Sequence, residues 1–195
     1  MHGLINRAIQ CFVTDVYGPD KWLEATRNAG LEFIEFEAMM VYDEAITPRL
    51  LDAIAQVLER PRAEMMEDLG TYLVSHPTVE ALRRLLRFGG VDFVEFLQSL
   101  DDLPDRARLA VSDLRIPRLE LREHTPNHFS LICDCPVSGY GHVMMGILRT
   151  MADDYGALAL LEHHGGGYGT EVISVSLIKT EFAEGRVFDL GARAG

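Results

Sequence analysis

The chain has 195 residues, of which 48% are hydrophobic, and 30 acidic against 18 basic side chains give a formal net charge of -12. A chain of this size buries a core without disulfides or a structural metal, and no apolar run reaches the roughly 18 residues that cross a bilayer. The negative charge repels phosphate backbones, and no Lys/Arg stripe offsets it, which excludes nucleic acid as a partner. Without a recognisable signal peptide or disulfide framework, we expect a cytoplasmic protein with no membrane span and three reduced thiols.

The first half of the chain carries helical periodicity almost throughout. Apolar residues recur at i, i+1, i+4, i+5 and i+8 from Leu4, which predicts an amphipathic helix from Gly3 to about Phe12. Prolines, glycines and capping residues then divide the following sequence into further helices. These helices are expected at 21–29, from Thr47 to Arg60, from Arg62 to Leu73, and from Ser75 to Gly90.

Another helix is predicted to begin at about Asp92 and to continue through residue 104. Its apolar residues lie at spacings that keep them on or near one side. They are Phe93, Phe96, Leu97, Leu100, Leu103 and Pro104. Because this side is apolar, we expect position 104 to face the interior of the protein.

After Asp113 the periodicity changes to the alternation of half-buried strands. Residues 119–122 and 129–133 predict a hairpin, residues 141–155 a helix, and residues 171–180 with 186–190 a second hairpin. A helical lobe followed by an antiparallel sheet with packed helices is an α+β fold. We expect one domain over 1–195, with the helical lobe at about 1–115 and the sheet-containing lobe at about 116–195.

Three stretches together resemble one known family. They are the opening Met1-His2-Gly3-Leu4-Ile5-Asn6-Arg7-Ala8, the segment Tyr42-Asp43-Glu44, and Leu100-Asp101-Asp102-Leu103-Pro104. The chain resembles the heme-nitric oxide/oxygen binding (H-NOX) family, whose proximal helix ends in Leu-Asp-x-Leu-His. In this sequence the frame is retained, but Pro104 stands where the family's iron-binding histidine is found.

The resemblance implies a heme between the two lobes, with Ile5, Ile116 and Pro117 lining and distorting the porphyrin. In the family a Tyr-x-Ser-x-Arg set on one strand face grips the heme propionates. Here the three positions fall on Cys133, Cys135 and Val137. An apolar valine cannot replace the forked, charge-assisted hydrogen bonds of arginine, so we expect a lower affinity for heme.

His142 lies five positions after Val137, where some oxygen-binding relatives carry a tyrosine that donates to the bound gas. A neutral imidazole is also a common iron ligand. His142 is therefore a candidate distal donor or substitute axial metal ligand. The alternative is a histidine at a helix start that is hydrogen-bonded to backbone or water.

Cys133-Asp134-Cys135 and His163-His164 have the ligand types of a tetrahedral zinc site. The pattern favours packed thiols over zinc, because alternate strand residues hold their sulfurs too far apart to share a metal easily. A redox role would require exposed thiols of lowered pKa. Zinc is therefore not expected.

The glycine-rich stretch from Gly165 to Gly169 lacks the lysine and the strand-loop-helix context of a phosphate-binding loop. We interpret it as a connection from a helix to a strand. No arrangement of serine or cysteine with histidine and an acid indicates a nucleophile, and we expect no enzyme activity.

These observations predict a non-enzymatic sensor or regulatory domain whose interlobe pocket binds heme atypically or takes another apolar ligand. One alternative is a heme-based gas sensor with His142 as axial ligand. Another is a heme-free signalling adaptor or a Cys/His zinc-redox switch. By analogy with the family, the partner is a histidine kinase or a cyclic-dinucleotide enzyme, and the ligand is a small apolar or gaseous molecule.

Overall fold

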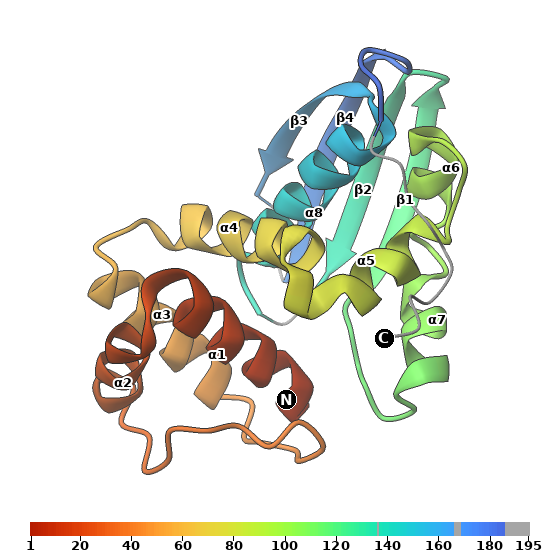
Figure 1. The fold of residues 1–195 in the computed structure, drawn as a ribbon. Helices are drawn as coiled ribbons and strands as arrows, with labels where there is room; N and C mark the ends of the chain where they lie inside the picture. The colour runs from red at the N-terminus through yellow and green to blue at the C-terminus, as the bar shows by residue number, and fades with distance from the viewer. Residues whose placement is uncertain (136, 166–168, 186–195) are drawn as a thin grey trace.

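The computed structural model describes residues 1–135, 137–165 and 169–185. Within these residues, eight α-helices, one short 3-10 helix and four strands build an α+β fold (Figure 1). Three N-terminal helices form a group beside a lobe that is built on the sheet, and helix α4 lies between the two. The predicted fold class is confirmed.

The N-terminal group comprises α1 (Gly3–Tyr17), α2 (Pro19–Asn28) and α3 (Ile46–Val57). Phe12, Leu50 and Ile54 bury their side chains almost completely in its core. The buried Thr47 hydroxyl donates to the Asn6 side-chain oxygen at 2.7 Å, which joins α3 to α1. The predicted helices here are confirmed to within a few residues at their ends.

Helix α4 (Arg62–Ser75) is followed by the 3-10 turn η1 (Pro77–Val79) and by α5 (Glu80–Arg87). Two short helices come next, α6 (Phe93–Gln98) and α7 (Leu103–Ala110). The Asp92 carboxylate accepts from the N–H of Glu95 at 2.9 Å and so caps α6 at its start.

The prediction of one helix from Asp92 through residue 104 is wrong, because a turn separates α6 from α7. Tertiary hydrogen bonds hold this turn. The Asp101 carboxylate accepts from the N–H of Leu121 at 2.6 Å, and the Arg106 guanidinium donates to the Ser99 carbonyl at 3.0 Å. Pro104 lacks an N–H group and therefore suits the first turn of a new helix.

The sheet contains β1 (Arg118–Thr125), β2 (His128–Asp134), β3 (Leu158–His164) and β4 (Thr170–Lys179). The strand order is β1-β2-β4-β3, and every neighbouring pair is antiparallel. Phe129, Leu131, Ile173 and Val175 project from β2 and β4 into the core and are fully buried. The hairpin of β1 and β2 confirms the first predicted hairpin.

Strand β3 is absent from the sequence prediction, and two expectations change with it. The glycine-rich stretch that begins at Gly165 connects β3 to β4, so its interpretation as a helix-to-strand connection is wrong. Strand β4 pairs with β2 on one edge and β3 on the other. The second strand predicted at 186–190 lies outside the described residues.

Helix α8 (Tyr140–Tyr155) lies across the sheet and crosses α4 (Figure 1). The two helix backbones touch at this crossing. A Cβ atom on Gly70 would lie 2.0 Å from the Val143 carbonyl oxygen, and one on Gly146 would lie 2.0 Å from the Glu67 carbonyl oxygen. Only glycine fits at either position, so the sequence itself sets this close approach.

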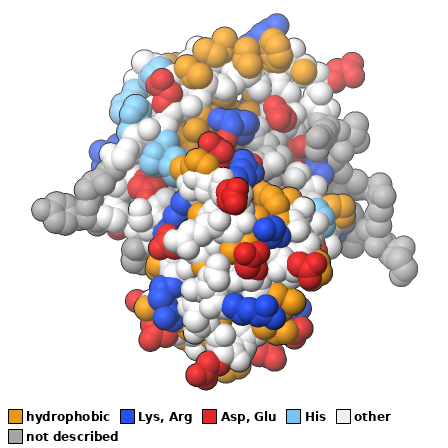
Figure 2. Space-filling view, turned by 90° about the vertical axis from the view of Figure 1, so that its left-hand side faces the viewer, with side chains coloured by type: hydrophobic (Ala, Val, Ile, Leu, Met, Phe, Trp, Pro, Cys, Tyr) orange, Lys and Arg blue, Asp and Glu red, His pale blue; other side chains and the backbone are white. Residues whose placement is uncertain are grey.

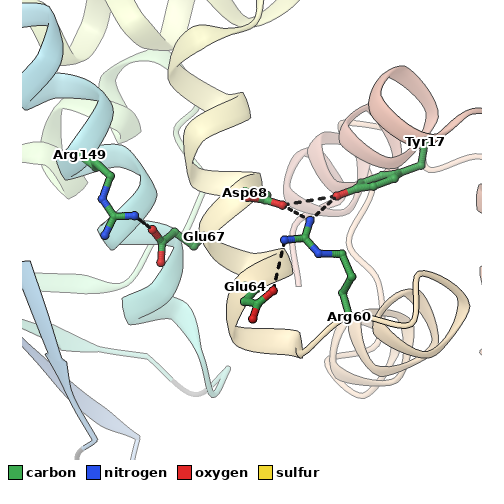
Figure 3. Close-up of polar contacts among 6 residues, drawn as sticks. All are labelled: Tyr17, Arg60, Glu64, Glu67, Asp68 and Arg149. Atoms are coloured by element: carbon green, nitrogen blue, oxygen red, sulfur yellow. Dashed lines mark hydrogen bonds and ion pairs between the residues drawn. The ribbon is translucent and has the colours of Figure 1, made fainter.

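Polar contacts extend from α4 to both sides (Figure 3). Glu67 pairs with Arg149 of α8, whereas Asp68 accepts from Arg60 and from the Tyr17 hydroxyl of α1. The Arg149 side chain is 57% exposed, and exposed pairs of this kind contribute about 0–1 kcal/mol. They orient the helices more than they stabilise them.

A cavity of about 260 Å³ lies on the α1 side of α4. Aromatic and polar side chains from the two helices line it together. The lining residues are Phe12, Val16, Tyr17, Asp68, Thr71, Tyr72, Ser75 and His76. The contact of α4 with α1 is therefore less closely packed than its contact with α8.

The face that carries the β3 edge has a mixed surface. Acidic and basic side chains are interspersed over its lower part, and apolar side chains gather at its upper end (Figure 2). Leu158 and Leu160 of β3 and Ile178 of β4 are exposed. No continuous basic strip is seen on this face.

Candidate ligand-binding cleft

A cleft of about 550 Å³ lies between α7 and the segment that leads into β1. Its lining residues are Asp101, Pro104, Asp105, Arg108, Leu114, Arg115, Ile116, Arg118, Leu119 and Glu120. The first four share a face of the α7 region because they are spaced by three or four positions. Leu103 and Ala107, on the other face of α7, are buried.

Two of the predicted site residues meet in this cleft, namely Pro104 and Ile116. Pro104 is half-buried on the first turn of α7, so position 104 faces the cleft and not the closed interior. Leu100 and Leu103 are 0% and 5% exposed and lie in the core behind this lining, and their predicted contact with a ligand stays a prediction. The Leu-Asp-x-Leu frame thus positions residue 104 through its buried leucines.

The other residues that the resemblance assigns to porphyrin contact lie outside the lining of this cleft. Ile5 of α1 is half-buried and packs against the core, and Pro117 is half-buried beside Ile116. Their role in ligand binding stays a prediction.

Cys133 and Cys135 are buried at the end of β2, where they are 1% and 7% exposed. Burial, reinforced by the negative charge of Glu171, raises the pKa of Cys133 to about 12. Burial likewise raises the pKa of Cys135. Thiols in this environment are protonated and weakly nucleophilic, which disfavours the redox-switch alternative.

We therefore expect Cys133 and Cys135 of the native protein to resist 5,5′-dithiobis(2-nitrobenzoate) at pH 8, because their thiolate fractions are small and the reagent cannot reach them. Absorbance at 412 nm measures the reaction, and the guanidinium-unfolded protein serves as control, with all three thiols reactive. Fast reaction that disappears in Cys133→Ser or Cys135→Ser would contradict the assignment of inert, packed thiols.

His142 lies in the first turn of α8 and stacks on His163 of β3, with ring centroids 4.0 Å apart. Burial lowers the pKa of His142, and the neighbouring His163 lowers it further. The ring is thus held mainly neutral, as an axial ligand requires. His142 does not line the cleft beside Pro104.

Glu171 of β4 organises the surroundings of this histidine pair. Its carboxylate accepts from the N–H groups of Gly139 and Gly141 at 2.5 and 2.7 Å and lies 3.0 Å from Nε2 of His163. Burial raises the pKa of Glu171, but the hydrogen bonds from His163 and the two glycines outweigh it and leave the pKa below its usual value. An anion therefore caps the N-terminus of α8 from a neighbouring strand.

The zinc pattern does not assemble. In the parts of the chain that the structure describes, no three histidine, cysteine or acidic side chains converge as metal ligands. The His163 ring is hydrogen-bonded to the Glu171 carboxylate at 3.0 Å, and the His164 ring is hydrogen-bonded to the Ser174 hydroxyl at 2.9 Å.

Sequence reasoning missed the arginines of the cleft. Arg108, Arg115 and Arg118 all line it. Their closeness to Ile116 and Pro117 was an available signal. The sequence could not predict which of these guanidinium groups lack partners, because that depends on tertiary contacts.

Heme does not fit this lining by ordinary coordination. Protein ligands to heme iron are histidine, cysteine, methionine or tyrosine side chains, and none of these is among the described residues that line the cleft. The Pro104 side chain has no atom that could coordinate iron.

Comparison with solved structures places the fold among H-NOX proteins. The Fe(II) unliganded H-NOX protein from K. algicida aligns with a TM-score of 0.78 and 16% identity over 97% of this chain and 100% of that chain. The Fe(II)NO H-NOX protein from S. oneidensis aligns with a TM-score of 0.72 and 17% identity over 91% and 99%.

A family model described as Haem-NO-binding (HNOB) matches residues 2–163, and the chain belongs to this family. Among curated proteins, it is 25% identical over 154 residues to the soluble guanylate cyclase gcy-31 of Caenorhabditis elegans, which is 79% of this chain and 22% of that protein. It is 19% identical over 160 residues to the soluble guanylate cyclase 89Da of Drosophila melanogaster, or 82% of this chain and 24% of that protein. The chain thus spans about a quarter of the length of these relatives.

Within the described residues, no helix has both the length and the apolar character needed to span a bilayer.

Proposed function

We propose that this chain is a non-enzymatic sensor or regulatory domain of the heme-NO/O2-binding family whose cleft binds an apolar ligand without standard heme ligation. One observation carries the proposal. Pro104 stands at the histidine position that follows the Leu-Asp-x-Leu frame and lines the cleft, and no described lining residue can bind iron in the manner of a heme protein. A pocket of about 550 Å³ falls within the usual range for small-molecule sites.

The regulated partner is a catalytic protein or domain. The curated relatives are soluble guanylate cyclases, and this chain matches under a quarter of their length. The family resemblance favours a histidine kinase or a cyclic-dinucleotide enzyme as the output. We place the domain in the cytoplasm.

Expression with supplemented heme, followed by an absorbance scan of the purified protein, tests the loss of heme ligation. We expect no stoichiometric Soret band, because the cleft supplies no axial ligand. The same preparation is analysed for iron content.

If a band appears, two variants show whether His142 is the axial ligand. A stoichiometric band that His142→Ala abolishes and His124→Ala retains would overturn the proposal in favour of a gas sensor ligated through His142. His124 is a suitable control because it is an exposed histidine on β1 that contacts Ser130.

A further inference from the structure

Two guanidinium groups at the cleft have no partner in the described part of the chain. Arg115 and Arg118 line the cleft and are exposed, and neither side chain makes a hydrogen bond or ion pair there. Asp134 stands opposite Arg118 in the register of β1 and β2, but no ion pair joins them. The two charges are therefore available to a ligand.

Two of the three carboxylates that line the cleft are in ion pairs, and the third accepts a backbone hydrogen bond. Asp101 accepts from the N–H of Leu121 at 2.6 Å, Asp105 pairs with Arg108, and Glu120 accepts from Arg122 at 2.8 Å. A hydrogen bond from a neutral N–H leaves Asp101 charged, so the lining groups outside ion pairs are one carboxylate and the guanidinium groups of Arg115 and Arg118. Their sum is one positive charge, although the chain as a whole carries -12. A local positive site on an acidic protein favours an anion where the rest of the surface repels it.

The remainder of the lining is apolar. Pro104, Leu114 and Ile116 are half-buried, and Leu119 is only 3% exposed. A ligand that fits both features has an apolar body against these side chains and an anionic group near Arg115 and Arg118. Arginine presents a planar fork of donors that matches a carboxylate in particular.

We propose that the cleft binds an amphipathic carboxylate, with its apolar chain against Pro104, Ile116 and Leu119 and its carboxylate on Arg115 and Arg118. This inference rests on the proposed function, since it names the ligand class of the same cleft. It assigns the recognition of the anion to two arginines of the segment that enters β1.

Octanoate and 1-octanol separate the charge from the apolar chain, because they share a chain length and differ in the head group. Each is titrated into the 15N-labelled full chain, and the shifts of the Ile116 and Leu119 amides are followed. We expect octanoate to bind about tenfold more tightly than 1-octanol, as one charge-assisted hydrogen bond of roughly 1.5 kcal/mol provides.

Arg115→Gln/Arg118→Gln is expected to remove this tenfold preference and to leave 1-octanol binding unchanged. Arg27→Gln, on the exposed surface of α2, is the matched control for loss of a positive charge and is expected to keep the preference. Because all three arginines are exposed, the amide spectrum of each variant is expected to retain the native fold.

The outcomes distinguish this inference from the proposal on which it rests. Equal binding of the two probes at the cleft, unaffected by the arginine substitutions, would overturn the anion preference and leave an apolar ligand site. Absence of any shift at Ile116 and Leu119 with either probe would overturn both, in favour of a closed adaptor.

Discussion

Gly146→Ala is expected to destabilise the protein by about 3 kcal/mol. The new methyl group would lie 2.0 Å from the Glu67 carbonyl oxygen and 2.7 Å from the Thr71 nitrogen, so α4 and α8 would have to separate. The gain in helix propensity, about 1 kcal/mol for alanine over glycine, is too small to offset this. Urea unfolding followed by circular dichroism measures the change.

Gly165→Ala is the control for the same chemical change, because a Cβ atom there has nothing within 4 Å. It is expected to alter stability by less than about 0.5 kcal/mol. If the two substitutions had equal effects, the α4–α8 backbone contact would not be the reason for glycine at position 146.

Asp154→Ala is expected to cost about 3 kcal/mol, at the lower end of the range for breaking a buried ion pair. The Asp154 side chain is 1% exposed, and its two oxygens accept from Nε and Nη2 of Arg83 at 2.7 and 3.0 Å. Removal of the carboxylate leaves a guanidinium that is 21% exposed without this bidentate partner. Urea unfolding at pH 7 gives the loss.

Asp153→Ala, on the exposed neighbouring position of α8, controls for the loss of a negative charge and is expected to change stability by less than about 0.5 kcal/mol. The double variant Arg83→Ala/Asp154→Ala is expected to be less destabilised than the sum of the single variants, because the two residues act on each other. Strict additivity would argue against the pair as the cause.

Much of the fold follows from local patterns in the sequence. The helices from α1 to α4 repeat apolar residues at helical spacing between recognisable caps, and the β1–β2 hairpin shows alternation around Thr125-Pro126-Asn127. These elements depend on near neighbours in the chain, which explains why periodicity is sufficient to find them.

The errors arise where distant residues decide the structure. The turn before α7 depends on Asp101 meeting Leu121 and on Arg106 meeting Ser99, and neither contact is visible in a local pattern. Strand β3 begins Leu158-Ala159-Leu160-Leu161, an apolar run without alternation that does not distinguish strand from helix. Only its pairing with β4 identifies the segment as a strand.

The candidate site likewise contains residues that the sequence could identify and residues that it could not. The frame around Pro104 could be found because it is contiguous, and Ile116 could be assigned to the same pocket from the family resemblance. The availability of Arg115 and Arg118 could not, since it depends on which carboxylates other residues have already engaged. The stacking of His142 on His163 likewise needs α8 and β3 to be placed together.

The close approach of α4 and α8 at Gly70 and Gly146 also bears on which parts of the molecule move together. Since the α4 and α8 backbones touch, we expect α4 to move together with α8, although the sequence places it in the helical half. Its other side borders the cavity and the partly buried contact of the Tyr17 hydroxyl with Asp68. We therefore expect relative movement between α1 and α4. A displacement that starts at the cleft has two routes to the N-terminal helices, across this contact or through His2, whose Nε2 lies 3.4 Å from a carboxylate oxygen of Asp113.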